Sequence, residues 1–141
     1  MATAWYYIEH ASVDVVDDSF YFDGLSDVSD MNGLRRYFLD HNRLYCYRDA
    51  TDEWVRNETA NKVTGWAETE DTVAPSPGDM LFWEWQDGAH TQMVIDYNKD
   101  LDNRMIFIEG PTIRLGRMDI RKNSMGPANY FFCVGRIPEN D

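Results

Sequence analysis

Apolar side chains in the first third of the chain recur with the period of a helix. They are spaced by three or four residues and follow a stretch rich in serine and aspartate: Met31, Leu34, Tyr37 and Phe38. Such spacing places them on one face of an α-helix, and serine and aspartate are favoured caps for its first turn. The pattern predicts an amphipathic helix over roughly Ser29 to Asn42.

A second helix is predicted to begin at Thr51 or Asp52, because either side chain can cap a first turn. Trp54 and Val55 would then face inward. Several residues that follow Val55 are weak helix formers. Residues 64 to 78 have the composition of a loop.

After Gly78 the pattern changes to that of strands. Four segments are apolar, rich in aromatic and β-branched residues, and separated by turn formers: Met80 to Trp85, Thr91 to Tyr97, Arg104 to Glu109 and Tyr130 to Ile137. Helices therefore come first and an antiparallel meander follows. This order predicts an α+β fold in which N-terminal helices pack on an antiparallel sheet.

Length and charge narrow the class of protein. A chain of 141 residues with 43% hydrophobic positions can bury one sizeable core, so residues 1–141 are expected to form a single domain. The 25 acidic and 13 basic residues give a net charge of −12, which would repel nucleic acids and anionic membranes.

The sequence shows no clear targeting signal or membrane span. No apolar run approaches about 18 residues, and the first ten residues lack the basic and hydrophobic blocks of a signal peptide. We expect a soluble chain with no membrane partner, and its compartment stays open.

Metal and cofactor chemistry have no support in the residue spacing. The three histidines show no HxxxH or HExxH arrangement, and there is no CxxC pair, glycine-rich phosphate loop or GxSxG elbow. The sequence therefore predicts neither a metal site nor a cofactor.

The segment PGDMLFWEWQDGAHTQMVIDY, residues 77–97, carries the strongest candidate for catalysis. A tight turn at Pro77-Gly78-Asp79 begins one strand, and the hairpin signal Asp87-Gly88 places His90 at the start of the next. A histidine there is either a core side chain satisfied by one hydrogen bond or a catalytic base. The segment resembles the NlpC/P60 and CHAP group of papain-like peptidoglycan hydrolases, and especially a related amidase domain family. The resemblance implies a papain-like fold and a Cys-His pair with His90 as general base.

The following strand extends the resemblance. RMIFIEGPT, residues 104–112, is similar to an "IEGN"-type sequence of CHAP-like domains, whose polar side chain orients the histidine. The resemblance assigns that role to Glu109. An exposed glutamate at the end of a strand is the alternative.

Two alignments of the N-terminal third disagree about the nucleophile. In the first, WYYIEH and the following residues resemble the middle of the amidase-like family, whose cysteine helix lies upstream of this segment. The chain would then begin after the nucleophile. In the second, SDVSDMNGL lies over the NlpC/P60 motif D-C-S-G-L, and Val28 occupies the cysteine position. Valine has no nucleophilic atom.

The two cysteines of the chain are weaker candidates. Cys46 follows the predicted helix, where neither a helix N-terminus nor a basic pair lowers its thiol pKa. Cys133 alternates with apolar residues in the last strand, as a small hydrophobic residue does. One disulfide between them is also possible.

Two functions follow. One is a papain-like amidase or peptidase, complete or lacking its cysteine helix, that acts on peptidoglycan peptides or a protein amide. The other is a non-catalytic module of the same fold that binds a protein partner, such as an acidic protein that neutralises a basic toxin.

Overall fold

A computed structural model describes residues 31–59, 67–85, 88–109, 114–126 and 129–137. Its elements, in chain order, are α3 (Met31–Asp40), β1 (Leu44–Arg48), β2 (Glu53–Asn57), β3 (Glu68–Val73), β4 (Met80–Trp85), β5 (Gly88–Asn98), the 3-10 turn η2 (Lys99–Leu101), β6 (Arg104–Glu109), β7 (Arg114–Asp119), α4 (Ile120–Met125) and β8 (Phe131–Gly135).

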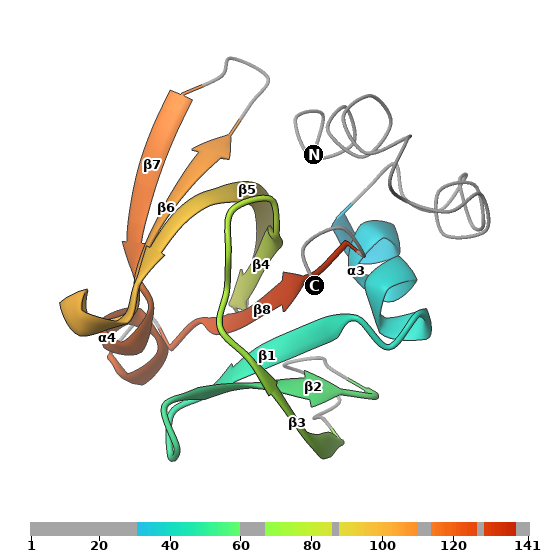
Figure 1. Ribbon diagram of the computed structural model, residues 1–141. Coiled ribbons are helices and arrows are strands. Elements are labelled where there is room, and N and C mark those ends of the chain that lie inside the picture. The colour runs from blue at the N-terminus through green and yellow to red at the C-terminus, as the bar shows by residue number, and fades with distance from the viewer. Residues whose placement is uncertain (1–30, 60–66, 86–87, 110–113, 127–128, 138–141) are drawn as a thin grey trace.

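All eight strands belong to one sheet, in the order β3-β2-β1-β8-β4-β5-β6-β7. Every neighbouring pair is antiparallel. Strands β1–β3 and β5–β7 form the two ends of the sheet (Figure 1). The sheet curls, so that side chains of β2 and β5 meet across its concave face. Trp54 of β2 donates a hydrogen bond to the hydroxyl of Tyr97 on β5, over 3.2 Å.

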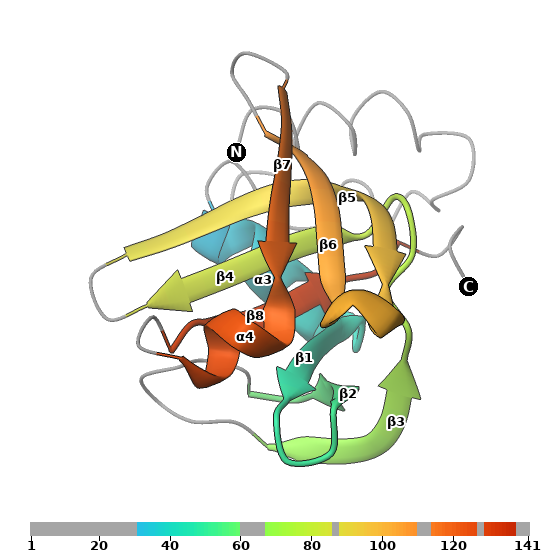
Figure 2. The same cartoon turned by 90° about the vertical axis from the view of Figure 1, so that its left-hand side faces the viewer.

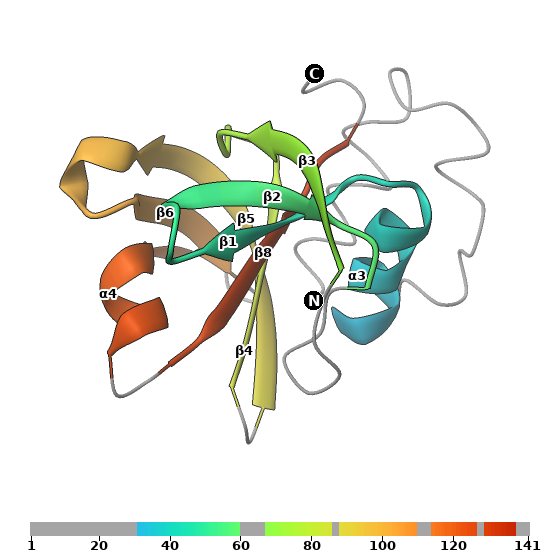
Figure 3. The same ribbon diagram turned by 90° about the horizontal axis from the view of Figure 1, so that it is seen from below.

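Both faces of the central strands are buried, each under a different helix. We call the side covered by α3 the α3 face; its core is Leu34, Tyr37, Phe38, Leu44, Cys46, Met80, Phe82, Cys133 and Ile137. The concave face is closed by the curled sheet and by Ile120 of α4; its core is Tyr47, Trp54, Leu81, Val94, Met105, Phe107, Ile120, Phe132 and Val134. Seen from below, α3 and α4 lie on opposite sides of the sheet (Figure 3).

The expected α+β fold, with N-terminal helices packed on an antiparallel sheet, is wrong, because the described residues are mostly β-strand. The predicted second helix is instead strand β2, and the loop expected over residues 64 to 78 contains strand β3. Asp52 adopts a positive φ of 54° in the turn before β2, so the residue expected to begin a helix instead closes the hairpin between β1 and β2. Trp54 and Val55 prefer strands, and β1 and β3 supply their neighbours.

The predicted first helix is confirmed over the described residues as α3, Met31–Asp40. Two residues after its end, Asn42 has a φ of 59°, in the left-handed region typical of the residues that terminate a helix. The backbone N–H of Arg43 then donates to the carbonyl of Phe38 over 2.8 Å.

The four predicted strands are also confirmed. β4 and β6 have the expected bounds, β5 is longer than predicted, and β8 is shorter. The tight turn before β4 is fixed by a buried ion pair, because Arg136 contacts both carboxylate oxygens of Asp79, at 2.7 and 3.1 Å. The same carboxylate accepts from the N–H of Ser76. Asp79 therefore anchors the turn.

Within the part of the chain that the structure describes, no helix has the length and apolar character needed to cross a membrane.

Candidate functional site

His90, the predicted general base, lies on β5 directly opposite Trp83 of β4. The two rings meet edge to face, with centroids 5.7 Å apart. The indole of Trp83 also packs against the ring of Tyr130 and donates a hydrogen bond to the amide oxygen of Gln92 over 2.6 Å. The half-buried imidazole is therefore part of an aromatic cluster on the concave face.

Helix α3 lies on the other face of the sheet. Directly opposed residues of antiparallel strands share a face, so His90 points to the side of Trp83, whereas α3 packs on Phe82 and Met80. A general base must come within hydrogen-bond reach of its nucleophile. In this arrangement α3 itself does not reach the imidazole. Val28, at the cysteine position of the second alignment, lies outside the described residues.

Glu109, the predicted orienting group, ends strand β6, which is paired with β5. Its neighbour Ile108 is opposite Met93, three residues beyond His90 in β5. The two predicted residues are thus on adjacent antiparallel strands, as the sequence indicated. The side chain of Glu109 lies outside the described residues, so a hydrogen bond to His90 stays a prediction.

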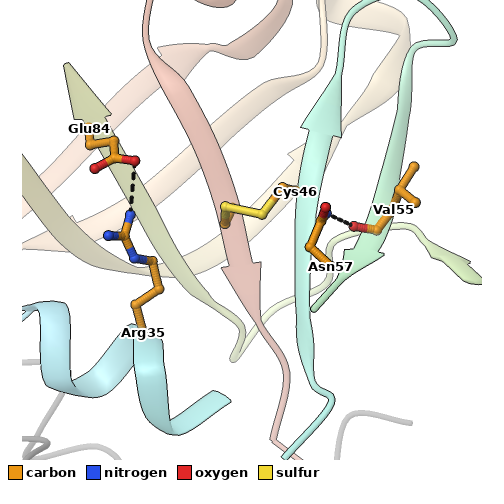
Figure 4. Close-up of a disulfide and its surroundings, with 6 residues drawn as sticks. Arg35, Cys46, Val55, Asn57 and Glu84 are labelled. Carbon is orange, nitrogen blue, oxygen red and sulfur yellow. Dashed lines mark hydrogen bonds and ion pairs between the residues drawn. A yellow bond between two sulfur atoms is a disulfide. The ribbon is translucent and has the colours of Figure 1, made fainter. Parts of the chain in front are cut away.

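Cys46 and Cys133 form a disulfide (Figure 4). They are directly opposed on β1 and β8, and both are buried, with 0% and 1% of their surface exposed. The described residues contain no free thiol. With its sulfur bonded to Cys133 on the α3 face, Cys46 is neither a thiolate nor a neighbour of His90.

A buried ion pair also crosses the α3 face. Arg35 of α3 lies 3.2 Å from the carboxylate of Glu84 on β4, with 8% and 10% of the two side chains exposed. Figure 4 shows the pair reaching between helix and strand. Sequence reasoning missed it, although a lone glutamate among the aromatic residues of β4 signals a need for a buried partner.

The concave face carries a polar cluster that sequence reasoning did not find. We call it the Asp52 cluster; it consists of Tyr47, Asp52, Tyr97, Asn103 and Arg121. The carboxylate of Asp52 accepts from the hydroxyl of Tyr47 at 2.5 Å and from the amide of Asn103 at 2.8 Å. Arg121 of α4 lies 3.5 Å away. The cluster thereby joins the β1–β2 turn, the β5–β6 connection and α4.

These contacts shift the protonation of the cluster. Burial tends to raise the pKa of Asp52, but hydrogen bonds from Tyr47 and Asn103 and the charge of Arg121 together lower it below its ordinary value. Burial, followed by the hydrogen bond to Asp52, raises the pKa of Tyr47. Asp52 is therefore an ionised acceptor and Tyr47 a protonated donor at neutral pH. These protonation states suit a structural role for Asp52 and Tyr47 better than a role in proton transfer.

The two edges of the sheet differ in charge. The β3 edge carries the exposed acidic residues Glu68, Glu70 and Asp71. The β7 edge carries the exposed basic residues Arg114 and Arg117. Arg48 of β1 and Arg56 of β2 pair with Glu68 and Asp71, so part of the acidic charge at the β3 edge is neutralised within the protein.

In the described residues, no group of three histidine, cysteine, aspartate or glutamate side chains could hold a metal ion. Comparison with family models, with curated proteins and with solved structures finds no match. The resemblance to amidases rests on the sequence motifs quoted above.

Proposed function

We propose that this chain is a non-catalytic module that binds a basic protein partner. The disulfide is the observation that carries the proposal. A Cys-His hydrolase needs a thiolate within reach of its imidazole, whereas both cysteines are bonded to each other and buried on the face opposite His90.

The basic partner is inferred from charge. A net charge of −12 attracts basic proteins over long range and accelerates their association. The β3 edge presents the exposed side chain of Glu70 to such a partner.

A Cys-His amidase or peptidase that acts on peptidoglycan peptides or a protein amide is the second candidate. The pairing of β5 with β6, which brings the His90 and Glu109 strands together, favours it. This function requires a cysteine other than the bonded pair, or reduction of that pair.

Hydrolysis assays separate the two candidates. The chain would be incubated with peptidoglycan and with a fluorogenic peptide amide, with and without reductant. We expect no turnover in either state. Turnover that appears on reduction and is lost in Cys46→Ser or His90→Ala would overturn the proposal and make Cys46 the nucleophile.

Binding requires its own test. A fluorescently labelled lysine-rich peptide serves as the probe, and its glutamate-rich counterpart serves as the control. We expect only the lysine-rich peptide to bind. A higher salt concentration should weaken this binding, because exposed charges are screened. Glu70→Lys should weaken binding more than Asp100→Lys, which makes the same charge change at an exposed site on η2. Equal losses in the two variants, or no binding of the lysine-rich peptide, would contradict a basic partner at the β3 edge.

A further inference from the structure

The two outer strands of the sheet differ in regularity. β7 pairs with β6 over all six of its residues in one unbroken register, from Arg104 opposite Asp119 to Glu109 opposite Arg114. The register of β3 against β2 shifts between Val55 and Asn57. A shifted register bends an edge and hinders the addition of another strand. β7 has no such irregularity.

β3 also uses part of its backbone internally. The N–H of Asp71 donates to the hydroxyl of Thr69, and that hydroxyl donates to the carbonyl of Arg56 on β2. The first of these bonds occupies a backbone N–H of β3 itself. Among the residues that the structure describes, β7 has a strand only on its β6 side (Figure 2).

The side chains of β7 are suited to a particular kind of strand. Leu115 is 68% exposed, and Arg117, two residues further on, shares its face of the sheet and is also exposed. Arg114 is exposed on the other face. An added strand would thus meet two positive charges three residues apart and one apolar side chain between them.

We propose that the β7 edge is a docking site for an extended, acidic segment of a partner protein, which adds to the sheet as a further strand. Main-chain hydrogen bonds would supply affinity, as in other cases of strand addition. Carboxylates opposite Arg114 and Arg117, and an apolar side chain opposite Leu115, would set specificity. This edge is separate from the acidic β3 edge, and the inference does not depend on a basic partner. The net charge of −12 repels an acidic segment over long range, so the local contacts at Arg114 and Arg117 must outweigh that repulsion.

The test uses a labelled octapeptide that carries two glutamates three residues apart with a valine between them. Its control has lysines in place of the glutamates. We expect the acidic peptide alone to bind, and Arg117→Glu to weaken it by about tenfold, since an attractive pair becomes repulsive. Lys99→Glu makes the same charge change at an exposed site on η2 and should leave the affinity nearly unchanged.

Amide hydrogen exchange locates the peptide. Its addition should protect amides of β7 and leave those of β3 unaffected. Unchanged circular dichroism and melting temperature would establish that Arg117→Glu is folded. The inference is overturned if the acidic peptide does not bind, if both variants lose affinity equally, or if protection appears elsewhere. Self-association of the chain that Arg117→Glu abolishes would identify a second copy, instead of an acidic partner, as the occupant.

Discussion

On the α3 face, a disulfide between two strands, an apolar core and the Arg35–Glu84 ion pair stabilise the packing, whereas on the concave face hydrogen bonds around Asp52 and aromatic contacts close the curl of the sheet. The disulfide joins β1 to β8, and these two strands connect the β1–β3 end of the sheet to the rest. The Asp52 cluster joins the same two parts from the other side.

The disulfide and the Asp52 cluster respond to different conditions. A covalent bond and buried apolar contacts depend on redox state and temperature but hardly on pH. A half-exposed carboxylate held by hydrogen bonds depends on its ionisation. A variant without the disulfide should have a stability that no longer depends on reductant. A variant without the Asp52 carboxylate should have a stability that depends less on pH.

Removal of the disulfide should have the largest effect. The bond links residues 87 positions apart, and a loop of that length constrains the unfolded chain by about 4–5 kcal/mol in the chain-entropy account. We expect Cys46→Ala/Cys133→Ala to lower the free energy of unfolding in urea by up to that amount. The double variant should also be insensitive to reductant, which is its control. Equal stability of the oxidised protein and the variant would show that the concave face alone holds the sheet.

Two glycines provide a matched pair, one on each face. A Cβ atom at Gly135 would meet Phe38 at 2.4 Å from Cδ2 and 2.5 Å from Cγ, near the root of a fully buried ring. We expect Gly135→Ala to cost about 1–3 kcal/mol in unfolding free energy, as overpacking does.

At Gly116 the closest atom is Cε2 at the far end of the Phe107 ring, which can move more readily. Gly116→Ala should therefore cost less than Gly135→Ala. Urea unfolding of both variants makes the comparison. The reverse order would show that the concave face is the more rigid of the two.

Asp52→Asn should weaken the concave face. The substitution keeps the size of the side chain but removes the charge that Tyr47, Asn103 and Arg121 stabilise. Since Asp52 is partly exposed, we expect a loss of about 1–2 kcal/mol in unfolding free energy. Asp100→Asn, at an exposed site, is the control and should be close to neutral. A neutral Asp52→Asn would mean that aromatic contacts suffice to close the curl.

The smallest expected effect is a pH dependence. The pKa of Asp52 is lowered in the folded state, so its contribution is complete above the unfolded value of about 4 and is lost as the pH falls through the folded value. The stability difference between the protein and Asp52→Asn should thus shrink below about pH 4. Urea unfolding at pH 7, 5 and 3 measures this. The pKa of Asp119 is also lowered, by the hydrogen bond from Arg104. Asp119 is present in both proteins, so its contribution cancels in the stability difference. A constant difference would contradict the role of the ionised carboxylate.

Features with a local cause could be predicted from the sequence. The helical spacing of Leu34, Tyr37 and Phe38 predicted α3, and the turn signals after residue 75 predicted β4, β5 and β6. These elements follow from periodicity and turn chemistry, which involve residues close together in the chain. For the same reason His90 could be placed near the start of a strand beside a hairpin.

Features that depend on distant partners could not be predicted from the sequence. Trp54 and Val55 suit a strand only because β1 and β3 flank them, and Asp52 meets Asn103 across 51 residues of sequence. The pairing of β1 with β8 places Cys46 opposite Cys133. The curl of the sheet and the side on which α3 packs likewise determine that His90 lies on the concave face, opposite α3. Local pattern carries no information about which strands become neighbours, because that choice depends on burying both faces of the whole sheet at once.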